Sequence, residues 1–104
     1  MRLAFSPAAE QDLEAIADYI ASDNPRRALS FVRELRAQCE RIARNPAGYR
    51  LRPELGHRIR SCAYGHYVIF FESGDDRVAI VRVLHGTRDG LAAFDADRKP
   101  RPAS

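Results

Sequence analysis

Two stretches in the first half of the chain carry apolar residues at helical spacing. The first helix is expected over residues 7–22, because Ser6 can accept hydrogen bonds from the first turn and Pro7 fits there without losing one. The second is expected over residues 25–44, where Asn24 gives the same start signal. The short connection predicts an antiparallel helix hairpin. Its buried stripes are Ala9, Leu13, Ile16 and Ile20 in the first helix and Ala28, Phe31 or Val32, Leu35, Cys39 and Ile42 in the second.

Shorter apolar runs predict four strands around these helices. One precedes the hairpin, at residues 3–5, and three follow it, at residues 58–64, 66–73 and 78–85. Residues 47–57 contain glycine and proline without a periodic pattern, so we expect a loop there. The order β-α-α-β-β-β predicts an α+β fold in which a helix hairpin packs on a mostly antiparallel sheet.

The last two predicted strands are apolar on both of their alternating faces. Such strands are either central strands covered on both sides or strands with one face that a partner covers, and we favour the partner. With 104 residues the chain has room for one core. We therefore expect a single domain over residues 1–94, followed by a polar, proline-containing tail over residues 95–104 that is disordered.

Charge is unevenly distributed along the chain. The total is 17 Lys+Arg against 14 Asp+Glu, a net charge of +3, and Lys99 is the single lysine. Residues 1–24 hold one base and five acids, a net −4, whereas residues 25–66 hold ten bases and three acids, a net +7. A total this small argues against direct sequence-specific DNA binding by this chain alone. The basic middle of the chain favours a protein partner instead.

The sequence lacks the motifs of the commonest cofactor and metal sites. It has no glycine-rich phosphate loop, dinucleotide fingerprint or HExxH, so no cofactor and no metal are expected. Cys39 and Cys62 stand apart without metal-ligand spacing, which favours a reducing cytoplasm. Cys62 and His66 could pair as nucleophile and base, but no third orienting group is evident. Without a signal peptide or a run of about 20 apolar residues, we expect a cytoplasmic protein with no membrane contact.

Arginines form the strongest group of candidate functional residues. Arg58 and Arg60 alternate onto one face of a predicted strand, and Arg88 follows the last strand. Arg82 lies inside an otherwise apolar strand, where a guanidinium is costly unless it is paired or at an open face. It either pairs with an acid, such as Asp89 or one on the first helix, or joins the other arginines in a cationic surface for RNA or an acidic protein segment.

Four segments of the chain, taken in order, resemble one family of bacterial proteins. They are DLEAIADYIASDNPRRALSFVREL (residues 12–35), NPAGYRLRPELGHRIRS (45–61), HYVIFFE (66–72) and VAIVRVLHGTRD (78–89). With these segments the chain resembles the ParE branch of the RelE/ParE toxin superfamily, from type II toxin-antitoxin systems. The resemblance covers nearly all of the chain that we expect to be ordered, and the fold of that family has the same order of helices and strands.

The resemblance implies a growth-arresting toxin that a ParD-like antitoxin holds inactive. In the ParE branch the target is DNA gyrase, which is poisoned without hydrolysis by the toxin. Toxicity and target binding are then expected to involve Arg58, Arg60, Arg82 and Arg88. Three side chains off or at the edges of the helix stripes are expected to contact the antitoxin: Tyr19, Leu29 and Tyr49.

The other branch of the superfamily, the ribosome-dependent mRNA interferases, provides an alternative function. At the positions that the resemblance assigns to catalysis, this chain holds Arg58, Arg60, Tyr67, Arg88 and Phe94. Phe94 lacks the hydroxyl needed for proton transfer and Tyr67 replaces a charge-stabilising arginine, although His66 or His85 could serve as acid or base. A third alternative is an inactive toxin fold retained as a binding or co-repressor subunit.

Overall fold

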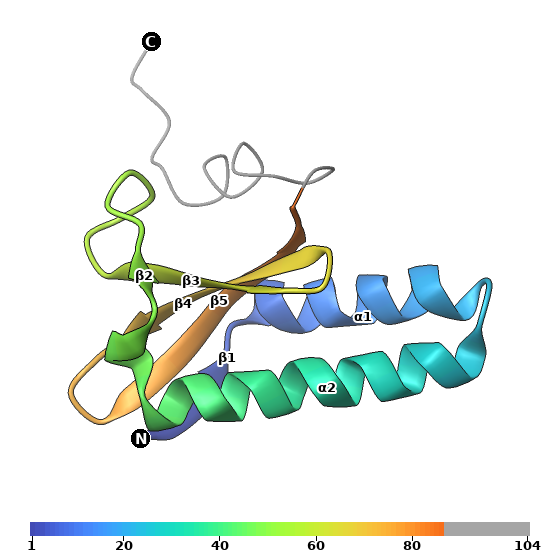
Figure 1. The fold of residues 1–104 in the computed structure, drawn as a ribbon, viewed down its shortest axis with the longest axis horizontal. Helices are drawn as coiled ribbons and strands as arrows, with labels where there is room; N and C mark the ends of the chain where they lie inside the picture. Colours follow the sequence, from blue (N-terminus) through green and yellow to red (C-terminus); the bar gives the residue numbers. More distant parts are fainter. Residues whose placement is uncertain (87–104) are drawn as a thin grey trace, which may run out of the picture.

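The computed structural model of this protein describes residues 1–86, drawn in colour in Figure 1. The strands are β1 (Arg2–Phe5), β2 (Arg50–Leu51), β3 (Ile59–Tyr64), β4 (Tyr67–Ser73) and β5 (Arg77–His85). The helices are α1 (Pro7–Ala21) and α2 (Pro25–Arg44), followed by a short 3-10 helix at Pro46–Gly48. Residues 87–104 lie outside the described residues, and with them Arg88, Asp89, Phe94 and the predicted tail at 95–104.

The five strands form one sheet in the order β1-β5-β4-β3-β2. β1 pairs with β5 in parallel, and the other three pairings are antiparallel. This confirms the predicted α+β fold with a mostly antiparallel sheet. The prediction that residues 47–57 are only a loop is wrong in part, because Arg50 and Leu51 pair with Ser61 and Arg60. A strand of two residues is too short to show the alternation from which strands are predicted.

Both helices lie on one face of the sheet, side by side and antiparallel (Figure 1). The main core fills the space between the helices and this face. Leu35 and Ile42 of α2 are fully buried there, as are Ile69, Phe71 and Ile80 of the sheet. Burial of each such side chain stabilises the fold by roughly 1.5–3 kcal/mol relative to an exposed one. The predicted apolar stripes of the helices therefore form the core, with Ile20 half-buried at its edge.

The face of the sheet away from the helices carries a second, smaller apolar cluster. Its members include Ile59 and Phe70, together with Leu55 from the connection between β2 and β3. Alternation along β4 explains the two clusters, because Phe71 faces the helices and Phe70 faces the other way. Leu55 covers part of the second face, and the expectation of a partner there stays a prediction.

Ser6 and Gly65 determine the local geometry at the start of α1 and in the β3–β4 turn. Ser6 caps α1, since its Oγ accepts a hydrogen bond from the Ala9 N–H at 3.0 Å. The same hydroxyl donates to the Val81 carbonyl at 2.7 Å, which ties the start of α1 to β5. The β3–β4 turn depends on Gly65, whose φ of 58° lies in the left-handed region that other residues rarely adopt.

Candidate functional site

A groove opens between the helix hairpin and the β3–β4 turn. Its volume is about 480 Å³. The lining comes from both helices, the β3–β4 turn, β4 and β5: Tyr19, Ile20, Arg27, Phe31, Gly65, His66, Tyr67 and His85. Among the described residues, no acid belongs to that lining. A groove of this size, with aromatic and aliphatic walls and a few polar groups, is typical of binding sites.

Aromatic contacts form the floor of the groove. The Phe31 ring centroid lies 5.6 Å from that of Tyr67 and 5.9 Å from that of Tyr64. The His85 ring meets Tyr67 edge-on at 5.3 Å and stacks on His66 at 6.1 Å. Each contact of this kind between aromatic rings adds about 0.5–1.5 kcal/mol to the effect of burial. Because the rings come from different elements, tertiary packing assembles the floor rather than a local motif.

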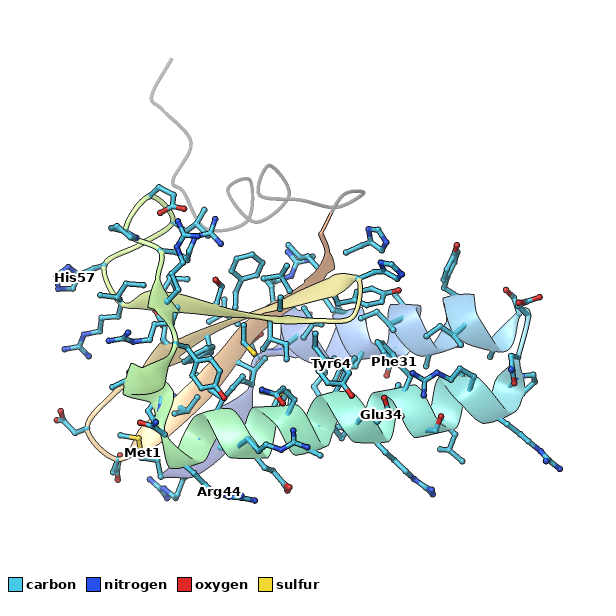
Figure 2. All side chains as sticks on the ribbon, in the orientation of Figure 1. Met1, Phe31, Glu34, Arg44, His57 and Tyr64 are labelled. Carbon is cyan, nitrogen blue, oxygen red and sulfur yellow. The ribbon has the colours of Figure 1, made fainter. Side chains whose placement is uncertain are left out.

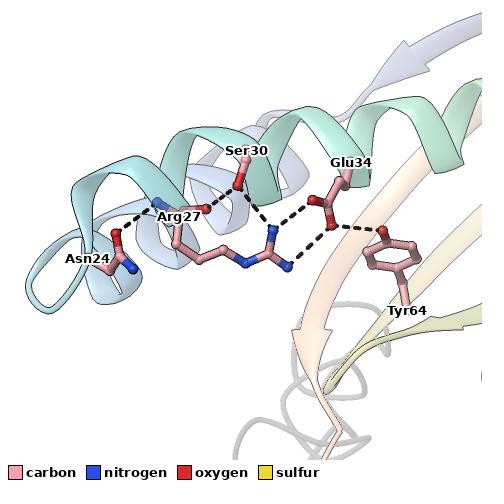
Figure 3. A network of polar contacts seen from close by, with 5 residues as sticks. All are labelled: Asn24, Arg27, Ser30, Glu34 and Tyr64. Carbon is pink, nitrogen blue, oxygen red and sulfur yellow. Dashed lines mark hydrogen bonds and ion pairs between the residues drawn. The ribbon is translucent and has the colours of Figure 1, made fainter.

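An exposed ion pair near the groove joins α2 to β3 (Figure 3). Glu34 accepts hydrogen bonds from the Arg27 guanidinium at 2.7 and 3.3 Å and from the Tyr64 hydroxyl at 2.9 Å. The hydrogen bond from Arg27, followed by that from Tyr64, lowers the pKa of Glu34, and the bond to Glu34 raises the pKa of Tyr64. Figure 2 shows Phe31, Glu34 and Tyr64 close together where α2 meets the sheet.

A second ion pair, which is nearly buried, joins α1 to β5. The Arg82 guanidinium donates to both carboxylate oxygens of Asp12, at 2.8 and 2.9 Å. The two side chains are 14% and 13% exposed. Asp12 also accepts from the Val83 N–H at 2.9 Å, where β5 extends beyond its pairing with β1. Arg82 therefore contacts an acid on the first helix, one of the partners considered from the sequence, while the other, Asp89, lies outside the described residues.

The two arginines near the start of β3 lie in different surroundings, because Arg60 is part of the strand and Arg58 is not. Arg60 donates to the Tyr49 carbonyl at 2.7 Å, on the helix side. Arg58 lies in the turn before β3 and lines a groove of about 200 Å³ with Glu72 and Ala79. Arg58 therefore does not take part in the alternation of β3 from which a shared face was predicted. The prediction that Arg58 and Arg60 share a face is wrong, because Arg58 precedes the strand.

Strand pairing separates two of the candidate nuclease side chains. Arg58 adjoins Ile59, which is level with Glu72 of β4, whereas His85 is level with Tyr67. The two levels are five residue steps apart along β4, about 17 Å at 3.4 Å per residue. Groups that act on one phosphodiester bond must lie within hydrogen-bond reach of it. Arg58 and His85 therefore do not form one catalytic centre in this structure.

Neither cysteine is placed for catalysis. Burial raises the pKa of the Cys39 thiol to about 12 and also raises that of Cys62, so both thiols stay protonated and weakly nucleophilic. His66 lies on the groove, while Cys62 accepts a hydrogen bond from the Gln38 amide at 3.3 Å. Residues 1–86 contain no cluster of three or more metal-ligating side chains. Within the same part of the chain, no helix has the length and apolar composition to cross a membrane.

Comparison with known proteins agrees with this fold. Residues 3–90 match the family described as the ParE toxin of the type II toxin-antitoxin system, parDE. The chain belongs to the ParE toxin family. It is 38% identical to Toxin ParE1 of Caulobacter vibrioides over 65 residues, 62% of this chain and 67% of that relative. A solved chain described as a chromosomal ParDE TA system from P. aeruginosa has the same fold, with a TM-score of 0.70 and 22% identity over 82% of this chain and 95% of that one.

In this ParE-family toxin, two of the three residues expected to contact an antitoxin are well exposed. Tyr19 is 59% exposed and lines the groove, and Leu29 is 57% exposed on α2. Tyr49 is half-buried instead. Its ring meets Phe71 edge-on at 5.8 Å, and its hydroxyl accepts a hydrogen bond from the Gln38 amide at 3.4 Å. Tyr49 therefore also contributes to the packing of α2 on the sheet.

The convergence of Phe31, His66 and Tyr67 on one groove is missed by the sequence analysis. Helical spacing predicts Phe31 as a core residue. Tyr67 is considered only because it stands where the RelE-like pattern has a charge-stabilising arginine. One signal could have indicated part of the groove, because the predicted strands at 58–64 and 66–73 are separated by Gly65 alone, which indicates a tight turn. Such a turn brings the strand ends together, but it does not indicate which helix lies beside them.

Proposed function

We propose that this ParE-family toxin inhibits DNA gyrase without hydrolytic chemistry of its own, and that a ParD-like antitoxin neutralises it in the cytoplasm. The observation that carries the proposal is the match to the ParE toxin family over residues 3–90. The geometry supports the same function, because two side chains that an alternative ribonuclease would use, Arg58 and His85, lie far apart on the sheet. Growth arrest then follows from gyrase that is trapped on broken DNA.

The groove supports the antitoxin part of this proposal. Tyr19 stands exposed at one wall, and the rings of Phe31 and Tyr67 form the floor. Aromatic side chains beside a concave apolar surface are typical anchors of protein interfaces. Arginine and histidine line the groove, so an antitoxin segment with an apolar residue flanked by carboxylates suits it. We expect Leu29 and Tyr49 to contribute further contacts outside the groove.

Four arginines are our candidates for toxicity and target binding: Arg58, Arg60, Arg82 and Arg88. Arg58 is exposed, whereas Arg60 and Arg82 donate hydrogen bonds within the chain itself. Substitution of either of the latter two tests stability together with target binding. Within the described part of the chain, Arg58 therefore provides the most direct test.

The mRNA interferase has less support from the structure. Such an enzyme needs an acid or base beside its phosphate-binding arginines, and His85 lies about 17 Å along β4 from the level of Arg58. Tyr67, which stands where the RelE-like pattern has an arginine, is buried in the floor of the groove. The third alternative, an inactive binding subunit, is favoured by no feature of residues 1–86.

Two assays on the purified chain separate the three functions. We expect it to inhibit supercoiling by gyrase and trap cleaved DNA, and to leave ribosome-bound mRNA intact. Arg58→Gln should weaken the inhibition of gyrase, whereas Arg2→Gln, which removes another exposed arginine, should not. Cut mRNA would support the interferase, and no activity in either assay would support the binding subunit. Either of these two results overturns the proposal.

A binding measurement tests the antitoxin part separately. Tyr19→Ala should weaken binding of the antitoxin encoded by the neighbouring gene by roughly 30-fold, the loss typical of an interface anchor. Tyr19→Phe should retain most of the affinity, because it keeps the ring. Gln11→Ala, an exposed change on the same helix, is the matched control. An unchanged affinity of Tyr19→Ala would remove the groove from the antitoxin interface.

A further inference from the structure

The outer face of α2 carries a row of arginines that the proposed function does not use. Arg26, Arg33 and Arg44, named here the α2 arginine row, are all exposed. At 3.6 residues per turn they lie within roughly 20° of one line, which spans about 27 Å at 1.5 Å per residue. The line runs opposite the buried stripe that contains Leu35. Figure 2 shows Arg44 on the side of α2 away from the sheet.

The α2 arginine row differs from neighbouring arginines in its lack of acidic partners. Arg27 pairs with Glu34 at 2.7 Å, and Arg36 pairs with a glutamate of α1 at 3.4 Å. Among the described residues, no carboxylate lies within 4.0 Å of a guanidinium of the row. On exposed helix faces, basic residues commonly have acidic residues three or four positions away, and these acids weaken the positive field of the bases. Of the two glutamates in α2, Glu34 pairs with Arg27, and Glu40, one turn before Arg44, lies near the row.

The net charge of the chain conceals how strongly the two helices differ. α2 carries six arginines and two glutamates, a net +4, whereas α1 carries four acids and no base, a net −4. Because the helices lie side by side, the two charges cancel in the total but not in space (Figure 1). A polyanion is therefore attracted to the α2 side of the helix layer and repelled from the α1 side.

We propose that the α2 arginine row binds the phosphate backbone of duplex DNA without reading its sequence. Guanidinium groups match phosphate oxygens in geometry and stay charged at physiological pH. Duplex DNA carries one negative charge per about 1.7 Å of axis, so a row of about 27 Å lies along many phosphates. A protein partner would need an apolar centre, and Leu29 is the one large exposed apolar side chain on α2. The face thus suits a uniformly charged rod better than a protein.

Salt dependence of DNA binding tests the proposal. The full chain, made by cell-free synthesis, is titrated into a labelled mixed-sequence duplex of 20 base pairs over a series of salt concentrations. Three phosphate contacts predict a slope of about −3 for the logarithm of affinity against that of salt. Arg33→Gln should reduce the magnitude of the slope by about one, and the triple change R26Q/R33Q/R44Q should remove it almost completely. Glu40→Gln should increase affinity, because it removes the carboxylate nearest the row.

Matched controls make the result specific. Arg77→Gln removes one exposed arginine at the β4–β5 turn and should leave the slope unchanged. Circular dichroism should show the same melting temperature for all variants, since every change lies on the surface. A parent slope near zero, an equal effect of Arg33→Gln and Arg77→Gln, or tighter binding of polyglutamate or phosphatidylserine vesicles than of the duplex would overturn the proposal. The assay contains neither gyrase nor antitoxin, so its outcome is independent of the proposed function.

Discussion

Two ion pairs attach the helices to the sheet, and they differ mainly in their contact with solvent. Asp12 and Arg82, which join α1 to β5, are 13% and 14% exposed, whereas Glu34 and Arg27 of α2 are 39% and 46% exposed. Each carboxylate accepts three hydrogen bonds, two from its arginine and one from the sheet. Among the described residues the two carboxylates thus accept the same number of hydrogen bonds, while the two pairs differ clearly in burial.

Burial determines how costly the remaining charge is when one partner of such a pair is removed. An exposed charge regains water, so an exposed pair contributes little to stability. A buried charge cannot do so, and the loss of its partner leaves it uncompensated. The pair between α1 and β5 is therefore expected to control stability, while the pair between α2 and β3 mainly positions Tyr64 beside the groove.

The largest expected effect comes from Asp12→Ala. The change removes the Asp12 carboxylate from the nearly buried Arg82 guanidinium and removes the acceptor of the Val83 N–H. We expect the free energy of unfolding to fall by about 3–5 kcal/mol, measured by urea denaturation. A loss under about 1 kcal/mol would show that water reaches the pair, and the contrast with the exposed pair would disappear.

The double change Asp12→Leu with Arg82→Met should recover much of this loss. Apolar residues of similar volume commonly replace a buried ion pair without a penalty. The Val83 N–H still lacks its acceptor, so a deficit of about 1–3 kcal/mol should remain in the same urea experiment. If the double variant were no more stable than Asp12→Ala, an uncompensated charge would not explain the single change. A folded double variant also tests whether the charge of Arg82 is needed for toxicity.

A much smaller effect is expected for Glu34→Gln. The side chain keeps its size and can still accept a hydrogen bond from Tyr64, while water compensates the exposed Arg27 guanidinium. The melting temperature should therefore fall far less than in Asp12→Ala. Tyr64→Phe is the matched change on the sheet, because it keeps the ring against Phe31 and removes the hydroxyl. A fall as large as that of Asp12→Ala would contradict the role assigned to burial.

The smallest expected effect is the pH dependence of the exposed pair. The lowered pKa of Glu34 means that its contribution is present above its ordinary value of 4.5 and is lost as pH falls through the lowered value. The raised pKa of Tyr64 means that its contribution is present below 10.0 and is lost as pH rises through the raised value. Melting curves of the parent and Glu34→Gln should therefore converge in acid. A difference that stays constant down to strongly acid pH would contradict this assignment.

The order of helices and strands could be predicted from the sequence because each signal is local. Ser6 and Asn24 cap their helices through backbone groups within three residues, as expected. The buried stripes follow from helical spacing alone, and the prediction that Arg82 needs an acid follows from the cost of an unpaired charge in an apolar strand. The likeness to the ParE family also depends on the sequence, since its four segments keep their order along the chain.

The tertiary structure alone decided which of these residues meet. β5 shows why: Val81 is an extra residue opposite Phe70 and Phe71, so Ile80 and Val83 both face the helices although strict alternation would separate them. Such a bulge depends on the register with β4, which periodicity within one strand does not contain. Long-range packing of this kind also brings Asp12 into contact with Arg82, separates Arg58 from His85 and assembles the aromatic groove. Local pattern thus determined both helices and four of the five strands of this protein, and packing between distant segments determined its candidate site.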